Sequence, residues 1–225
     1  MSEAFLLITL NTKTDFHLNT RLANFLSIAL HPLLMPTILF LLLLFIAPTP
    51  LGAESLETLM KLAVVGFVFI YTFALPAYFV YLLKRWGMIS SLKLDNLKDR
   101  RLPYFMTAII YIFLGYFLYS KNSMLFPCGF ILWSIAAVIL CVGIISLWWQ
   151  ISAHAAGVGG MIGALAGILV QFGEHSLFFP LLFLIILAGY VISARLALNA
   201  HTPAQVGAGF LLGLGLSLAS IYVLF

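Results

Sequence analysis

Basic residues and histidines occur in three short segments of this chain, each beside an apolar stretch long enough to cross a membrane. The segments contain Lys93 and Arg100, then Ser152, Ala153 and His154, and finally Arg195 and His201. Charged groups are costly in or beside a bilayer, so a site is the default interpretation wherever such a chain keeps them. Cations grouped with imidazoles suit a phosphate group. The three segments therefore predict a phosphate pocket.

The composition indicates an integral membrane protein. Hydrophobic residues make up 64% of the chain and charged residues only 8%, which excludes an ordinary soluble globular domain. Only helices and closed barrels satisfy their backbone in hydrocarbon, and the sequence has long unbroken apolar runs without strand-like alternation. We therefore expect an all-α fold.

Seven apolar runs are long enough to be considered as spans, and they predict a polytopic transmembrane helical bundle. The runs are 29–47, 60–83, 103–119, 126–148, 153–171, 178–197 and 203–224. The third run is short, so six spans with one re-entrant or interfacial segment remain an alternative.

The first residues of the chain are expected to precede the bundle. They have no basic head followed directly by an apolar core and a small-residue cleavage site, so we expect no signal peptide. Phe16, Leu22 and Phe25 fall roughly on one side of a helix, which suits a segment lying in the membrane interface. We therefore divide the chain into an interfacial segment, 1–27, and a transmembrane domain, 28–225.

Alternating helices place the three segments on one face of the membrane, because they occupy the loops after the second, fourth and sixth spans. Most cations lie on the same face: Lys13, Arg21, Lys84, Arg85, Lys93, Lys98, Arg100 and Arg101. The positive-inside rule then places this face in the cytoplasm, and we expect a bacterial inner membrane. The bias is smaller if some of these cations bind substrate.

Small residues and cysteines add two structural expectations. Glycines recur at every fourth position, at 159, 163 and 167 and again at 209 and 213, which lets the fifth and seventh helices approach their neighbours closely. The spacing leaves a homodimer through these helices open. Cys128 and Cys141 fall in one span, too far apart to bond, and neither has a metal-ligand spacing.

Two of the segments predict helix starts that bind anions. Ser152 can cap the fifth helix, which leaves the first amide N–H groups, including that of Ala153, directed at an anion beside His154. Thr202 and Pro203 repeat the arrangement at the seventh helix, directly after His201. Both imidazoles should therefore lie near positive helix ends.

The remaining basic residues are interpreted individually. Arg195 lies near the end of an apolar helix and needs an anionic partner, which a bound phosphate would supply. The structural alternatives are an ion pair with Asp95 or Asp99, or a side chain that extends to the membrane interface. We assign no functional role to the other histidines, which are His17, His31 and His175.

These segments resemble the motifs of the type 2 phosphatidic acid phosphatase superfamily of membrane lipid phosphatases. That family's pattern is Lys-x6-Arg-Pro, then Pro-Ser-Gly-His, then Ser-Arg-x5-His-x3-Asp. This chain has Lys93-x6-Arg100, then Ile151-Ser152-Ala153-His154, then Ala194-Arg195-x5-His201-x3-Gln205. The resemblance covers roughly residues 93–215.

The resemblance implies a metal-independent phosphatase that passes through a phosphohistidine. His201 matches the nucleophile, and His154 matches the general acid that protonates the departing lipid oxygen. The groups that match the phosphate-binding residues are Lys93, Arg100, Ser152, the amide of Ala153, and Arg195. Phosphoryl transfer is catalysed largely by positioning and by cations directed at the phosphoryl oxygens, which agrees with this set.

The chain departs from the family pattern most at Gln205, which replaces the aspartate expected to orient the nucleophilic imidazole. An amide oxygen still accepts a ring N–H, but a neutral group cannot stabilise an imidazolium. In serine proteases, an Asp to Asn change beside the catalytic histidine lowers turnover about 10⁴-fold. We therefore expect a weak enzyme.

The predicted function is hydrolysis of phosphate from a phosphorylated lipid of the phosphatidic acid, phosphatidylglycerol phosphate or isoprenyl diphosphate class. The alternative is a catalytically impaired binder or transporter of phosphorylated lipids. We expect no cofactor, because no carboxylate and histidine cluster has metal-ligand spacing and the cations supply the charge that magnesium would. The expected partners are the lipid substrate and the bilayer, with no nucleic acid.

Overall fold

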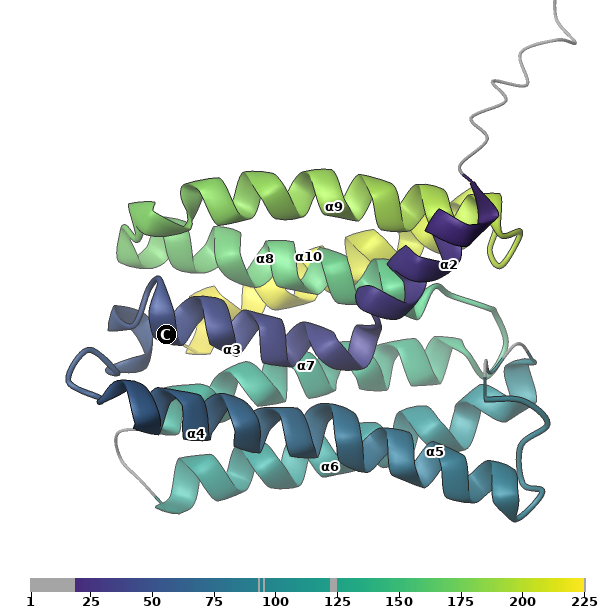
Figure 1. The fold of residues 1–225 in the computed structure, drawn as a ribbon, viewed down its shortest axis with the longest axis horizontal. Coiled ribbons are helices and arrows are strands. Elements are labelled where there is room, and N and C mark those ends of the chain that lie inside the picture. Colours follow the sequence, from purple (N-terminus) through teal and green to yellow (C-terminus); the bar gives the residue numbers. More distant parts are fainter. Residues whose placement is uncertain (1–18, 93, 95, 122–124, 225) are drawn as a thin grey trace, which may run out of the picture.

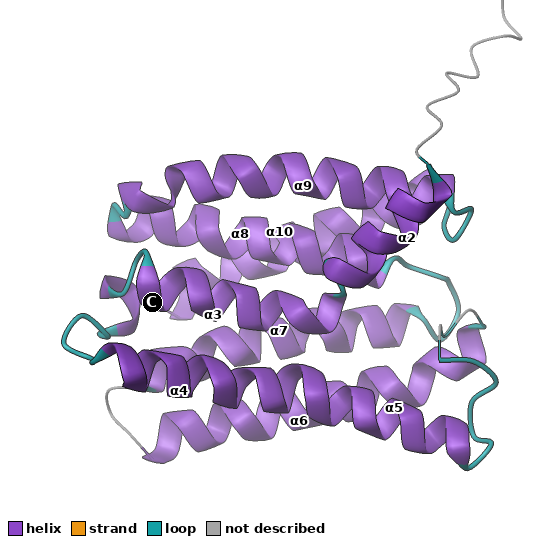
Figure 2. Cartoon of the chain, viewed as in Figure 1, coloured by secondary structure: helices purple, strands orange, loops and turns teal. Residues whose placement is uncertain are grey.

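The computed structural model describes residues 19–92, 94, 96–121 and 125–224, which form a bundle of long helices (Figure 1, Figure 2). Its α-helices are α2 (Thr20–Ala29), α3 (Met35–Phe45), α4 (Thr58–Phe69), α5 (Leu75–Arg85), α6 (Leu97–Lys121), α7 (Phe126–Ile145), α8 (Ala153–Phe172), α9 (Phe178–Ala197) and α10 (Pro203–Leu224). Short helical turns at Pro32–Leu34, Thr49–Leu51 and His175–Leu177 and a π-helix at Ile70–Ala74 join or extend them.

The described part of the chain contains seven helical stretches long and apolar enough to cross a membrane, which confirms the seven-span prediction. Two spans are composite: α2 and α3 form Thr20–Phe45, and α4 and α5 form Thr58–Arg85. The third span is longer than the apolar run predicts. Its helix begins at Leu97 rather than near Pro103, because the polar residues at its start continue the helix beyond the hydrocarbon. A six-span arrangement is therefore not supported.

The three motif-bearing connections lie at the same end of the bundle, on the right in Figure 1. They join α5 to α6, α7 to α8, and α9 to α10. The last residues of α3, α6 and α8 and the first residues of α4, α7 and α9 lie at the opposite end (Figure 1). The topology thus gathers segments that are far apart in the sequence onto one face.

Helices α8 and α10 are in backbone contact along their glycines. A Cβ atom on Gly209 would lie 2.5 Å from the carbonyl oxygen of Ser152, and one on Gly213 would meet the carbonyl oxygen of Ala156. In the other direction, Gly159 of α8 lies against the backbone of α10 at Phe210. The predicted close approach is confirmed.

The second span is interrupted by a π-helical turn that is tied to α6. Pro76 lacks the N–H that would bond the carbonyl of Thr72 in a regular helix, and the hydroxyl of Tyr111 donates to that carbonyl instead, at 2.8 Å. Tyr111 is fully buried. This bond ties the π-helical turn that leads into α5 to α6, and both of these helices line the cavity described below.

The first span bends between α2 and α3. Leu30 ends α2, and the ring of His31 caps the turn at Pro32 by accepting the N–H of Leu33 at 3.2 Å. Helix α2 then packs against α9 (Figure 1). The domain boundary expected between residues 27 and 28 falls inside α2, and residues 1–18 of the expected interfacial segment lie outside the described residues.

The α8–α10 contact predicts opposite effects for alanine at two nearby glycines of α10. Gly209→Ala should lower the free energy of unfolding by about 1–3 kcal/mol, because its new methyl group meets the Ser152 backbone. Gly207→Ala should leave stability unchanged or raise it by about 0.5–1 kcal/mol, because a Cβ there has nothing within 4 Å. Thermal unfolding of the purified variants in detergent measures both. Equal unfolding temperatures would contradict the packing.

Candidate active site

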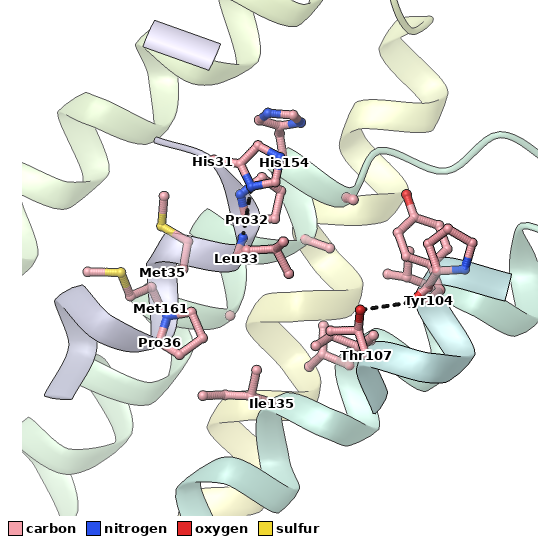
Figure 3. A pocket seen from close by; sticks show the side chains of 18 of the residues that line it. His31, Pro32, Leu33, Met35, Pro36, Tyr104, Thr107, Ile135, His154 and Met161 are labelled. Carbon is pink, nitrogen blue, oxygen red and sulfur yellow. Dashed lines mark hydrogen bonds between the residues drawn. The ribbon is translucent and has the colours of Figure 1, made fainter. Parts of the chain in front are cut away.

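A cavity of about 660 Å³ opens at the motif end of the bundle. Four of the residues singled out from the sequence as charged or imidazole groups line it together: Arg100, His154, Arg195 and His201. They come from all three segments: Arg100 from α6, His154 from α8, and Arg195 and His201 from the end of α9 and the connection to α10. Figure 3 shows part of this cavity, with His154 beside His31 at one end and Tyr104 and Thr107 of α6 across from them.

His201 is held by two oxygen atoms at one ring nitrogen. Its Nδ1 lies 3.2 Å from the backbone carbonyl oxygen of Gln150 and 3.2 Å from Oε1 of Gln205. Both oxygens are acceptors, so Nδ1 carries the proton in the neutral ring. The lone pair is then on Nε2. The arrangement therefore prepares Nε2 of His201 as the basic and nucleophilic nitrogen.

Burial keeps this imidazole neutral. Only 8% of the surface of His201 is exposed. Burial, and then the positive charge of Arg100, lower the pKa of His201 to about 4, although the hydrogen bond with Gln205 acts in the opposite direction. The lone pair on Nε2 is consequently available throughout the neutral pH range.

Gln205 also caps α10. The hydroxyl of Thr202 accepts the N–H of Gln205 at 3.4 Å, and Oε1 of Gln205 accepts the N–H of Thr202 at 3.1 Å. This reciprocal pair is a capping box, in which a Gln or Glu at the third helical position is favoured. One amide oxygen thus fixes both the start of α10 and the ring of His201. Gln205 also lines a second, outer cavity that shares His201 with the first.

The second motif divides between a structural and a cavity-lining role. Ser152 is fully buried, and its hydroxyl accepts the N–H of Ala155 at 3.4 Å as the predicted cap of α8. Its own N–H donates to the carbonyl of Gln205 at 3.2 Å. Ser152 is not among the residues that line either described cavity, whereas Ala153 and His154 line the larger one. The positive end of α8 therefore meets the cavity through Ala153 and His154.

Arg100 joins the first motif to the second. Its Nε donates to the carbonyl of Leu94 at 2.6 Å, and its NH1 donates to the carbonyl of Ile151 at 3.3 Å. The side chain is 5% exposed and lines the cavity. Arg101 adds a bond from NH2 to the carbonyl of Leu147 at 3.0 Å. Lys93, the other basic residue expected at the site, lies outside the described residues.

Ser27 of α2 contacts two of the expected site residues. Nε2 of His154 lies 3.0 Å from the carbonyl oxygen of Ser27, and NH1 of Arg195 donates to the Ser27 hydroxyl at 3.4 Å. The first contact requires a proton on Nε2 of His154, because a carbonyl oxygen only accepts hydrogen bonds. Helix α2 therefore lies against the site, and its Ser27 carbonyl accepts a hydrogen bond from the Nε2–H of His154.

The structure corrects the interpretation of His31, to which the sequence assigned no part in the site. Its ring lies against that of His154, with the centroids 5.7 Å apart in an edge-on arrangement, and it lines the cavity (Figure 3). The sequence signal was weak, because His31 belongs to no spaced motif. Its neighbour Pro32 was the available clue, since a proline there starts the short helical turn that His31 caps.

Comparisons with protein-family models, with curated proteins and with solved structures find no match to this chain. The resemblance to the lipid phosphatases therefore rests on the three sequence motifs alone.

Proposed function

We propose that this integral membrane protein is a lipid phosphatase that removes phosphate from a phosphorylated lipid through a phosphohistidine at His201. The observation that carries the proposal is the cavity in which neutral, oriented His201 lies with Arg100, Arg195 and His154. Two guanidinium groups and the start of α8 supply the positive field that a phosphoryl group requires. The substrate class is a phosphate or diphosphate ester of phosphatidic acid, phosphatidylglycerol phosphate or isoprenyl type.

The proposed reaction has two displacements at phosphorus. Nε2 of His201 forms the N–P bond while the P–O bond to the lipid breaks, and the departing oxygen takes a proton from Nε2 of His154, which enters this step as the imidazolium beside the anionic phosphate and leaves it as the neutral ring with its proton on Nδ1. Water then attacks phosphorus, gives its proton to His154, and the N–P bond breaks to release phosphate. The departing lipid oxygen would replace the Ser27 carbonyl as the acceptor of the His154 N–H. Arg100 and Arg195 would hold the phosphoryl oxygens.

A binder or transporter of phosphorylated lipids is the second candidate, and Gln205 is the observation that favours it. Its neutral amide orients His201 without stabilising positive charge on the ring. The cations of the cavity would still bind a phosphate in such a protein. Turnover is the property that separates the two functions.

Phosphate release from a panel of phosphorylated lipids tests the proposed function. The purified protein should release phosphate in the presence of EDTA, because its own cations supply the charge. His201→Ala should lower release by at least about 10³-fold through loss of the nucleophile. His175→Ala is the matched control, since this exposed histidine lies at the opposite end of the bundle and should leave the rate unchanged.

Two results would contradict the phosphatase. One is the absence of phosphate release from every lipid of the panel, and the other is release that persists undiminished in His201→Ala. Restoration of an EDTA-inhibited activity by magnesium would contradict the metal-independent mechanism alone.

Gln205→Glu distinguishes the enzyme from the binder. Glutamate keeps the length of the side chain and the capping box with Thr202, and it adds the negative charge that stabilises an imidazolium at His201. In an enzyme, turnover should rise about tenfold or more. In a binder, no phosphate is released and the added carboxylate weakens lipid phosphate binding by repulsion. Unchanged turnover in an active protein would refute the proposed role of Gln205.

We further propose that the motif end of the bundle faces the cytoplasm across a bacterial inner membrane. Lys84 and Arg85 end α5, and Lys98, Arg100 and Arg101 begin α6, all at this end. A cysteine at exposed Asn96 should resist an impermeant thiol reagent in intact cells, whereas one at exposed Ser176, at the other end, should react. The reverse labelling pattern would place the site outside.

A further inference from the structure

The cavity continues from the cations into the apolar interior of the bundle, and we call this apolar part of the cavity the arm. Small residues of α8 line one wall at helical spacing: Ala153, Ala156, Gly157, Gly160 and Ala164. Branched side chains of α7, among them Ile135 and Val138, line the facing wall. Figure 3 shows this arm below the two histidine rings, where Met35, Met161 and Ile135 surround the space.

The arm is long. The lining residues extend from Ala153 to Ala164 on α8 and from Val142 to Ile131 on α7, about 16 Å along each helix at 1.5 Å per residue. Ile221 near the end of α10 is also part of the lining, about 27 Å along the axis from the start of that helix. The hydrocarbon core of a bilayer is about 30 Å thick, so the cavity extends across at least half of it.

The lining along this length is predominantly apolar. The interior therefore fits an extended hydrocarbon chain.

The cavity also reaches the bilayer at its side. Ile28 of α2 and Tyr81 of α5 both line the cavity, yet 72% and 49% of their surfaces are exposed. Each side chain thus lines the cavity and is also exposed, so the cavity opens at the surface of the bundle beside α2 and beside α5. This opening gives a lipid a route by which its phosphate reaches the cations without leaving the membrane.

We infer that the arm is a binding site for a hydrocarbon chain of the phosphorylated lipid, with the phosphate at Arg100 and Arg195 and the chain extending toward Ile221. The identity of the headgroup rests on the proposed function. The preferred substrate is then a lipid whose chain is long enough to extend along the arm, such as a long-chain isoprenyl phosphate.

Photocrosslinking tests this placement without relying on turnover. The probe is a long single-chain alkyl phosphonate with a diazirine at the end of its chain, added to the full-length protein in nanodiscs. Adducts should form on deep lining residues such as Ile131, Ser134 and Ile221. Ser134→Phe, which fills the arm, should lower these adducts about tenfold, equivalent to about 1.4 kcal/mol. Ala137→Phe on the exposed side of α7 is the matched control and should leave them unchanged.

A chain-length series supplies the second measurement. Ser134 lies about 12 Å along α7 from Val142, so the blocked arm still admits a short chain. Ser134→Phe should therefore keep the phosphate release measured with a short alkyl phosphate and lose about tenfold with the long one. Retained short-chain activity also shows that the variant folds, and Ser217→Leu on α10 repeats the block from another wall.

The outcomes separate the two proposals. Deep adducts without phosphate release would support the chain site and contradict the phosphatase. Phosphate release with adducts confined to bilayer-facing residues, or equally strong deep adducts in Ser134→Phe and in wild type, would overturn the chain site and leave the phosphatase standing.

Discussion

The close packing of α8 against α10 is the contact on which the site depends. In a bilayer, lipid is as apolar as a leucine side chain, so helices associate through close packing and hydrogen bonds rather than through the hydrophobic effect. Gly209 and Gly213 allow the backbones to meet, and the N–H of Ser152 donates to the carbonyl of Gln205 across the junction. This single contact sets the start of α8 beside the capping box of α10. His154 and His201 are therefore presented to one cavity by two helix starts.

The arginines complete the site by joining its loops. A guanidinium group has several donors in a fixed plane, which lets Arg100 bond Leu94 and Ile151 while its charge faces the cavity. The same charge contributes to the low pKa of His201. Substitution of Arg100 by lysine would keep a charge but not the two directed bonds. The side chain of Arg100 thus both joins the two loops by hydrogen bonds and lowers the pKa of His201.

Local patterns predicted much of this arrangement. The spans, their shared motif face, the cap at Ser152 and the glycine contacts follow from spacing along one helix, which is visible in a sequence. The contacts of Ser27 and His31 with the site do not, because they join α2 and its bend to residues more than a hundred positions away. The start of α6 was misplaced, since hydropathy detects the hydrocarbon boundary and not the end of a helix. The use of Ser152 as a buried cap, rather than at the cavity, depends on the rotation of α8 against α10.

The phosphohistidine is the central claim, and rapid trapping of the phosphorylated protein tests it most directly. The protein would be mixed with a lipid carrying radiolabelled phosphate, quenched in alkali and digested, and the labelled peptide identified by mass spectrometry. The account predicts an acid-labile, alkali-stable phosphoryl group on His201 that is absent from His201→Asn. It should accumulate in a His154 variant given a substrate whose leaving group needs no protonation. Phosphate release in single-turnover experiments without any protein-bound phosphoryl group, or with the label on another residue, would contradict it.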